Sequence, residues 1–143
     1  MKQINVGIIG TGWCGGIRAN TCMSNPLVKD LHIAEINPER LEEVKKLTNP
    51  VTATLDYRNL LKIDDIDAYF ISATPEDIHF PMARDCMEAG KHVFLEKPLS
   101  ITLAEADELV ALAEKNNVKF TIGYSQRFNP KFAYLKKCLN EGT

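Results

Sequence analysis

The sequence predicts an α/β fold built on a doubly wound parallel sheet that is covered by helices on both faces. Two observations predict it. Short, almost wholly apolar runs rich in β-branched residues recur along the 143 residues, as in strands that are buried on both faces. Amphipathic segments with recognisable helix ends separate these runs along the whole chain. Strands and helices that alternate in this way form a parallel sheet with right-handed crossover connections.

Six strands are expected, each short and apolar. They are residues 4–9, residues 31–36, a short strand within residues 51–62, and residues 68–73, 93–95 and 118–122. The limits of the third strand are weakly marked, and its stretch is expected to hold a short helix as well.

Two of the helices have clear start signals. Asn37 followed by Pro38 is an N-cap with proline in the first turn, and the apolar face of this helix is expected to be Leu41, Val44 and Leu47. Thr102 with Glu105 forms a capping box. The face that this second helix is expected to bury consists of Leu103, Ala106, Val110 and Ala113.

Pro81 limits the helix that lies between these two. Proline is tolerated only in the first turn of a helix, so this one is expected to begin near His79 or Phe80. Gly90 follows it, at a point where a left-handed residue commonly ends a helix before the next strand.

A glycine-rich loop connects the first strand to a helix that continues to about Met23. Its pattern is G-x-G-x-x-G, which is weak evidence alone but gains value between a buried strand and a helix. The first glycine permits the tight turn, the second lets the backbone approach a diphosphate, and the third allows close packing of helix and strand. An ordinary turn without a ligand is the alternative. The residues expected to bind here are Gly10, Thr11, Gly12, Trp13, Cys14 and Gly15.

Glu35 strengthens this prediction, because it lies 20 residues after Gly15 at the end of the second strand. A carboxylate at that position accepts hydrogen bonds from the ribose hydroxyls of a dinucleotide and repels a 2′-phosphate. Neither Ile36 nor Asn37 carries a positive charge, and Arg40 is expected to lie a turn into the next helix. The sequence therefore predicts a Rossmann domain that binds NAD, with NADP the less favoured cofactor.

Composition excludes several classes of partner. The chain is 45% hydrophobic and 25% charged, with a formal net charge of −2 and both signs spread throughout. Such a chain offers no basic face for nucleic acid and no polybasic or long apolar stretch for a membrane. The N-terminus lacks the pattern of a signal peptide, and the four cysteines form no Cys-x-x-Cys unit. We therefore expect reduced thiols, no metal site and a cytoplasmic location.

Two further segments complete a resemblance to a known family. They are residues 73–79, A-T-P-E-D-I-H, and residues 90–99, G-K-H-V-F-L-E-K-P-L. With the glycine-rich loop and residues 35–40, they resemble the Gfo/Idh/MocA family, named for glucose-fructose oxidoreductase and inositol dehydrogenase. The resemblance runs from Val6 to about Pro130. It implies an oxidoreductase that transfers hydride between a nicotinamide cofactor and a sugar, a polyol or a related small hydroxyl or carbonyl compound.

The resemblance also implies roles for Glu96, Lys97 and Pro98. Lys97 is expected to be the catalytic residue, near the nicotinamide ring and the reacting oxygen of the substrate. A lysine at the carboxyl end of a sheet strand is well placed to stabilise a developing alkoxide. Glu96 is expected to contact the cofactor or to orient Lys97, and a cis bond before Pro98 fits the family.

The other segment is expected to contribute to the same site. Ala73, Thr74 and Pro75 would contact the ribose or the diphosphate, largely through backbone atoms. His79 resembles a residue close to the nicotinamide side, although its position also suits a helix-capping or core histidine. Trp13 is expected either to pack over the loop or to shield the cofactor.

Members of the family continue into a second domain that carries substrate contacts. We therefore expect residues 1–124 to form the dinucleotide-binding domain and residues 125–143, with a helix over 132–139, to lead into a domain that this chain lacks. Such a chain binds NAD(H) but turns over slowly, exposes apolar surface near its end, and is a possible homo-oligomer. The alternatives are a non-catalytic NAD-sensing or scaffold domain and, less favoured, a site for another adenosine ligand such as S-adenosylmethionine.

Overall fold

The computed structural model describes residues 2–142, and its centre is a parallel sheet of six strands in the order β3-β2-β1-β4-β5-β6. Every neighbouring pair of strands is parallel, which confirms the predicted doubly wound fold. The strands are β1 (Ile4–Ile9), β2 (Val28–Ala34), β3 (Thr52–Thr54), β4 (Ala68–Ile71), β5 (His92–Leu95) and β6 (Phe120–Ile122).

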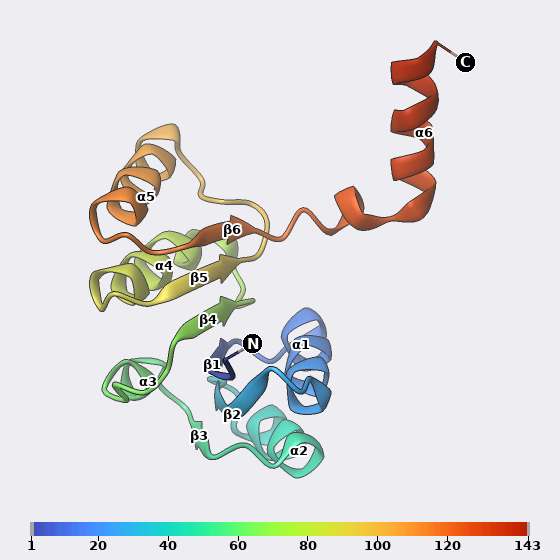
Figure 1. Cartoon of the computed structure of the whole chain (residues 1–143). Coiled ribbons are helices and arrows are strands. Elements are labelled where there is room, and N and C mark those ends of the chain that lie inside the picture. The colour runs from blue at the N-terminus through green and yellow to red at the C-terminus, as the bar shows by residue number, and fades with distance from the viewer. Residues whose placement is uncertain (1, 143) are drawn as a thin grey trace.

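Helices cover both faces of the sheet (Figure 1). One face carries α1 (Trp13–Ser24) and α2 (Pro38–Thr48), and the other carries α3 (Arg58–Leu61), α4 (His79–Glu88) and α5 (Leu103–Lys115). Side chains alternate across the sheet, so Val6 and Ile8 pack under α1 and α2, whereas Ile9 joins the core beneath α3, α4 and α5. Two apolar cores, one on each face, therefore hold the sheet in place.

The strand order reverses beside β1, because β2 lies on one side of it and β4 on the other. The connections leave β1 and β4 toward opposite faces, and a crevice opens between them at the carboxyl ends of the strands. Several predicted strands are too long at this end. The predicted runs continue to residues 36 and 73, whereas β2 ends at Ala34 and β4 at Ile71. The N–H groups of Glu35 and Ser72 still donate to Thr54 and Ile9 of the neighbouring strands, and beyond these bonds the chain turns to line the crevice.

The local end signals are confirmed. The side chain of Asn37 accepts hydrogen bonds from the backbone of Glu39 and Arg40, and Thr102 and Glu105 form the reciprocal capping box. Helix α4 begins at His79, as Pro81 predicted. Gly90 has a φ of +72°, the left-handed conformation that was expected.

Two predicted apolar faces are partly wrong. In α2 the buried residues are Leu41, Val44 and Thr48, and Leu47 is exposed. In α5, Leu103 is 84% exposed and Val110 is also exposed; Ala106 is half-buried, and the fully buried residues are Leu109 and Ala113. Each helix touches the sheet along a narrow stripe, and the sequence pattern left the rotation of that stripe about the helix axis open.

The last segment stands away from the sheet (Figure 1). After β6 the chain forms a short 3₁₀ turn, η2 (Ser125–Phe128), and then α6 (Pro130–Glu141), which is longer than the predicted helix at residues 132–139. The main contacts of α6 are with η2. Its exposed large side chains, with that of the preceding turn, are Phe128, Phe132, Tyr134, Leu135 and Leu139. Self-association through this surface stays a prediction.

No helix among residues 2–142 combines the length and the apolar character that crossing a bilayer requires.

Candidate functional site

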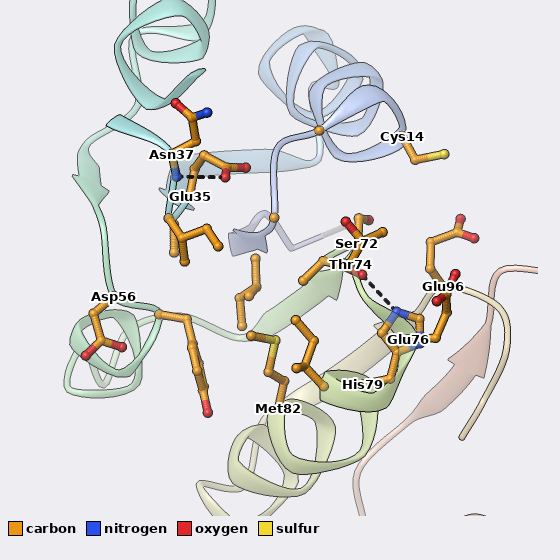
Figure 2. Close-up of a pocket in the computed structure, with 18 of the residues that line it drawn as sticks. Cys14, Glu35, Asn37, Asp56, Ser72, Thr74, Glu76, His79, Met82 and Glu96 are labelled. Atoms are coloured by element: carbon orange, nitrogen blue, oxygen red, sulfur yellow. Dashed lines mark hydrogen bonds between the residues drawn. The ribbon is translucent and has the colours of Figure 1, made fainter. Parts of the chain in front are cut away.

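A cavity of about 700 Å³ opens at the carboxyl ends of the strands, where the strand order reverses. Its walls come from the loop before α1, the residues after β2, residues 55–58, residues 72–74, several residues between 76 and 82, and the two residues after β5. Figure 2 shows Glu35 and Asn37 at one end of this cavity and His79 and Glu96 at the other. The two family-like segments and the glycine-rich loop thus meet around one space.

Most of the residues predicted from the sequence line this cavity. They are Gly10, Gly12, Trp13, Cys14, Glu35, Ala73, Thr74, His79, Glu96 and Lys97. The other three do not line it: Thr11 and Gly15 are buried behind the loop, and Pro75 lies outside the walls. Thr11 and Gly15 therefore shape the loop from behind, which sequence reasoning did not separate from direct binding.

The glycines of the loop have three different surroundings. Gly10 has a φ of +81°, and a Cβ there would lie 2.6 Å from the backbone of Ala73. A Cβ on Gly15 would collide with the carbonyl oxygen of Gly10. Around Gly12, by contrast, nothing lies within 4 Å of where a Cβ would stand. The first and third glycines are therefore required by the fold, whereas the second leaves an open cradle.

The start of α1 faces this cradle. Gly12 is the N-cap residue and contributes no side-chain hydrogen bond to the first turn, while Trp13 and Cys14 line the cavity. The first backbone N–H groups of a helix lack partners within it, and the helix dipole places partial positive charge there. The loop thus fits a diphosphate. Trp13 is 82% exposed and does not pack over the loop.

Glu35 binds the loop as well as lining the cavity. Its Oε2 accepts hydrogen bonds from the backbone N–H of Thr11 (2.7 Å) and from the Thr11 hydroxyl (3.1 Å). Its Oε1 accepts from the N–H of Asn37 at 3.1 Å, the dashed line beside Glu35 in Figure 2. A carboxylate has about four acceptor positions, so acceptor capacity is left for a ribose. The same side chain thus orders the loop and presents an acceptor to the cavity.

Arg40 reaches the loop too, which sequence reasoning missed when it placed this residue away from the site. Its Nε donates to the Thr11 carbonyl at 2.7 Å, and its Nη2 lies 3.4 Å from the carbonyl oxygen of Gly12. Its Nη1 donates to Glu43 at 2.6 Å. A Cβ on Gly16 would collide only with the end of the flexible Arg40 side chain, so the sequence carried no firm signal of the contact.

At the opposite end, Glu96 lies at the centre of a polar network. Its Oε2 accepts a hydrogen bond from the backbone N–H of Lys97 at 3.1 Å, and its Oε1 forms an ion pair with Arg18. Arg18 also donates to the hydroxyl of Ser72 (2.8 Å), and its guanidinium lies 4.9 Å from the ring centre of Phe94. The Lys97 side chain is exposed at the cavity mouth. Sequence reasoning missed Arg18 and Ser72, because no local pattern links them to Glu96.

The backbone between these groups takes an unusual form. The Thr74–Pro75 and Lys97–Pro98 peptide bonds are both cis, and the second agrees with what the resemblance implied. His79 is buried beside them, within hydrogen-bond distance of two backbone carbonyl groups.

An apolar wall lines part of the cavity. It consists of Ile36, Leu55, Tyr57, Ile78 and Met82. The Tyr57 hydroxyl donates to Asp85 at 2.8 Å, and burial together with this carboxylate raises the pKa of Tyr57 to about 12. The phenol therefore stays neutral at physiological pH. Sequence reasoning missed Leu55 and Tyr57, because the segment before α3 carries no binding motif, and it missed Met82 of α4, which lies outside the two family-like segments.

Across residues 2–142, no group of three or more His, Cys, Asp or Glu side chains is arranged to hold a metal ion.

Comparison with known proteins decides the family. The family model described as "Oxidoreductase family, NAD-binding Rossmann fold" matches residues 4–124. The chain belongs to this family, the Gfo/Idh/MocA oxidoreductases. The matched residues contain the whole sheet and all the cavity walls described above, so this member presents an NAD-binding Rossmann domain.

Several relatives resemble this family member over nearly its whole length. Uncharacterized oxidoreductase YrbE of Bacillus subtilis is 36% identical over 141 residues, which are 99% of this chain and 41% of YrbE. Myo-inositol 2-dehydrogenase of Thermotoga maritima is 30% identical over 98% of this chain and 42% of its own length. The chain therefore spans about two fifths of these relatives.

A solved structure gives the same result for the fold. Scyllo-inositol dehydrogenase of Lactobacillus casei, crystallised with NAD(H) and scyllo-inositol, superimposes with a TM-score of 0.89 at 29% identity. The match covers 99% of this chain and 42% of that protein.

Proposed function

We propose that this chain is the cofactor-binding domain of an NAD-dependent dehydrogenase or reductase that acts on a polyol or sugar. One observation carries the proposal: the open cradle at Gly12, the Glu35 carboxylate and Lys97 line a single cavity. The substrate class rests on the inositol dehydrogenases among its relatives. Bound NAD supplies a hydride acceptor for alcohol oxidation and, when reduced, a hydride donor for carbonyl reduction.

The residues divide the cavity into two ends. Toward Glu35, the apolar side chains of Ile36 and Leu55 suit an adenine ring, and the carboxylate accepts from the adjoining ribose. In the middle, the N–H groups at the start of α1 face the diphosphate. The nicotinamide end then lies toward Glu96 and Lys97, where the lysine ammonium stabilises negative charge that develops on a substrate oxygen.

Charge near Glu35 favours NAD over NADP. The carboxylate repels a 2′-phosphate on the ribose, and Arg40 does not offset it. The three Arg40 nitrogens point to the carbonyl groups of Thr11 and Gly12 and to Glu43, so the charge of Arg40 is already engaged.

Trp13 provides the test of this proposal. It is the single tryptophan of the chain, and its exposed indole lines the cavity. NADH should quench its fluorescence on binding, with a lower dissociation constant for NADH than for NADPH. Glu35→Ala should raise the NADH dissociation constant by about 10- to 100-fold, since a hydrogen bond to a charged group contributes about 1.5–3 kcal/mol.

Glu39→Ala is the matched control. Glu39 is an exposed acid in the first turn of α2 and does not line the cavity, so its removal should change NADH affinity by less than about twofold. Tighter binding of NADPH, or equal effects of the two substitutions, would refute the assignment of Glu35. Saturable NADH binding without any polyol or sugar turnover by the complete protein would favour a sensor over an enzyme.

A further inference from the structure

His79 lies between two backbone carbonyl groups. Its side chain is buried, with 1% of its surface exposed. Its Nδ1 lies 2.8 Å from the carbonyl oxygen of Pro98, and its Nε2 lies 3.0 Å from that of Ala73, the dashed line at His79 in Figure 2. Both ring nitrogens therefore face an acceptor at hydrogen-bond distance.

A neutral imidazole cannot satisfy this geometry. It carries one N–H donor and one lone pair, so one nitrogen would point its lone pair at a carbonyl oxygen. Burial excludes water from separating the two, and a buried polar contact of this kind is costly. We infer that His79 is a doubly protonated imidazolium that ties together the two loops bordering the nicotinamide end of the cavity and thereby positions Lys97.

The His79 ring connects the segments that follow β4 and β5, beyond the last backbone hydrogen bonds between these strands. The ladder ends at Ile71 and Leu95, and the N–H of Glu96 still donates to Ile71 at 2.9 Å. Past that point, the carbonyl groups of Ala73 and Pro98 are linked only through His79 among the hydrogen bonds of residues 2–142. The ring therefore links the two segments where backbone hydrogen bonds between them have ended.

Lys97 is held from both sides by this arrangement. Its own N–H donates to Glu96, and the carbonyl of the next residue, Pro98, accepts from His79. His79 is thus a positioning residue that acts through the backbone. The importance of this position for hydride transfer rests on the function proposed for Lys97, whereas the protonation state of His79 does not.

Some charged groups near the His79 ring favour its cationic form, and others oppose it. Glu76 from η1 (Glu76–Ile78) and Glu96 line the same end of the cavity and favour a cation. Arg18 already pairs with Glu96, and Lys97 and the N-terminal end of α4 oppose a cation. The cation is favoured against these opposing charges by two direct hydrogen bonds, at 2.8 and 3.0 Å, from a ring that is shielded from water.

The three histidines of the chain allow a test with internal references. Long-range ¹H–¹⁵N correlation spectra of chain labelled at its histidine rings, recorded without cofactor at about pH 7.5, report the protonation of each nitrogen. His92 Nδ1 accepts from the backbone N–H of Lys119 at 3.1 Å and must be unprotonated, and burial lowers the pKa of His32. We expect two protonated nitrogens in His79 alone. A neutral His79 would overturn the inference.

A variant tests the positioning role separately. The amide of His79→Gln has one donor nitrogen and one acceptor oxygen, so it cannot donate to both carbonyl groups. Exchange of the Lys97 amide hydrogen should accelerate by about tenfold or more, while that of Ile8 in the centre of the sheet changes little. Equal acceleration at both amides would indicate a general structural role, and no acceleration at either would mean that His79 positions nothing; both results contradict the proposal. Neither experiment needs NADH, so failure here is distinguishable from failure of cofactor binding.

Discussion

Gly15→Ala is expected to destabilise the domain by about 3 kcal/mol or more, because the added methyl group would collide with the backbone carbonyl of Gly10. Neither partner can yield easily. Gly15 is buried in the first turn of α1, and Gly10 directly follows β1 in a left-handed conformation that is itself held against Ala73. Urea unfolding of the variant should therefore show a large fall in midpoint, or no folded baseline.

Gly12→Ala should have the opposite consequence. Its methyl group would enter open space, so the free energy of unfolding should change by about 1 kcal/mol or less, the difference between glycine and alanine at an N-cap. The same methyl would occupy the cradle in which we place the diphosphate, and the NADH dissociation constant should rise by about 100-fold or more. Calorimetric titration beside urea unfolding measures both effects.

Two results would contradict the different roles assigned to Gly12 and Gly15. Wild-type affinity in Gly12→Ala would show that no ligand approaches the loop there. Wild-type stability in Gly15→Ala would mean that α1 can shift away from β1, and that the close approach is not required by the fold.

Arg18→Met is expected to lower the free energy of unfolding by about 2–3 kcal/mol. The side chains of Arg18 and Glu96 are 18% and 14% exposed, so removal of the guanidinium leaves a largely buried carboxylate without its counter-charge. Breaking a fully buried pair costs about 3–5 kcal/mol, and the partial exposure of this one reduces that figure. Contact with the Phe94 ring is lost as well.

A double-mutant cycle with Glu96→Gln isolates the ion pair. If the cost comes from the stranded carboxylate, the double variant should be less destabilised than the sum of the two single variants. Arg58→Met is the matched control, because Arg58 also lies over an aromatic ring and beside a carboxylate, but is mainly exposed. Its loss should cost about 0.5 kcal/mol or less. Equal costs for Arg18→Met and Arg58→Met would refute the stabilising role of the buried pair.

Features encoded within a few residues were predicted from the sequence. The cap at Asn37, the capping box at Thr102, the start of α4 before Pro81 and the turn at Gly90 each depend on groups within one helical turn. Strands β1 and β2 were recognised because an apolar, β-branched run records burial on both faces, whereas β3, which is only half-buried, was weakly marked in the sequence. The outward rotation of Leu103 and Val110 was not predicted, because it depends on how α5 lies on the sheet.

In the site, too, local features were predicted from the sequence and contacts between distant residues were not. The glycine pattern and its spacing to Glu35 are local enough to predict a loop and an acid on neighbouring strands. No such pattern predicts that Arg40 returns to the loop, or that Arg18 meets Glu96 from 78 residues away in the chain. These contacts exist because α2 packs beside α1, and because α1 also packs against β4, which lies next to β5 in the sheet.

By itself, the sequence determined the alternation of strands and helices, the helix ends and the glycine turn that can receive a diphosphate, since backbone preference and burial period act over a few residues. Tertiary structure alone decided which charged side chains meet, which glycines are crowded and which is open, and that the ring of His79 has a carbonyl oxygen on each side. Those outcomes depend on the order and divergence of strands that are far apart in the chain, which no local pattern records.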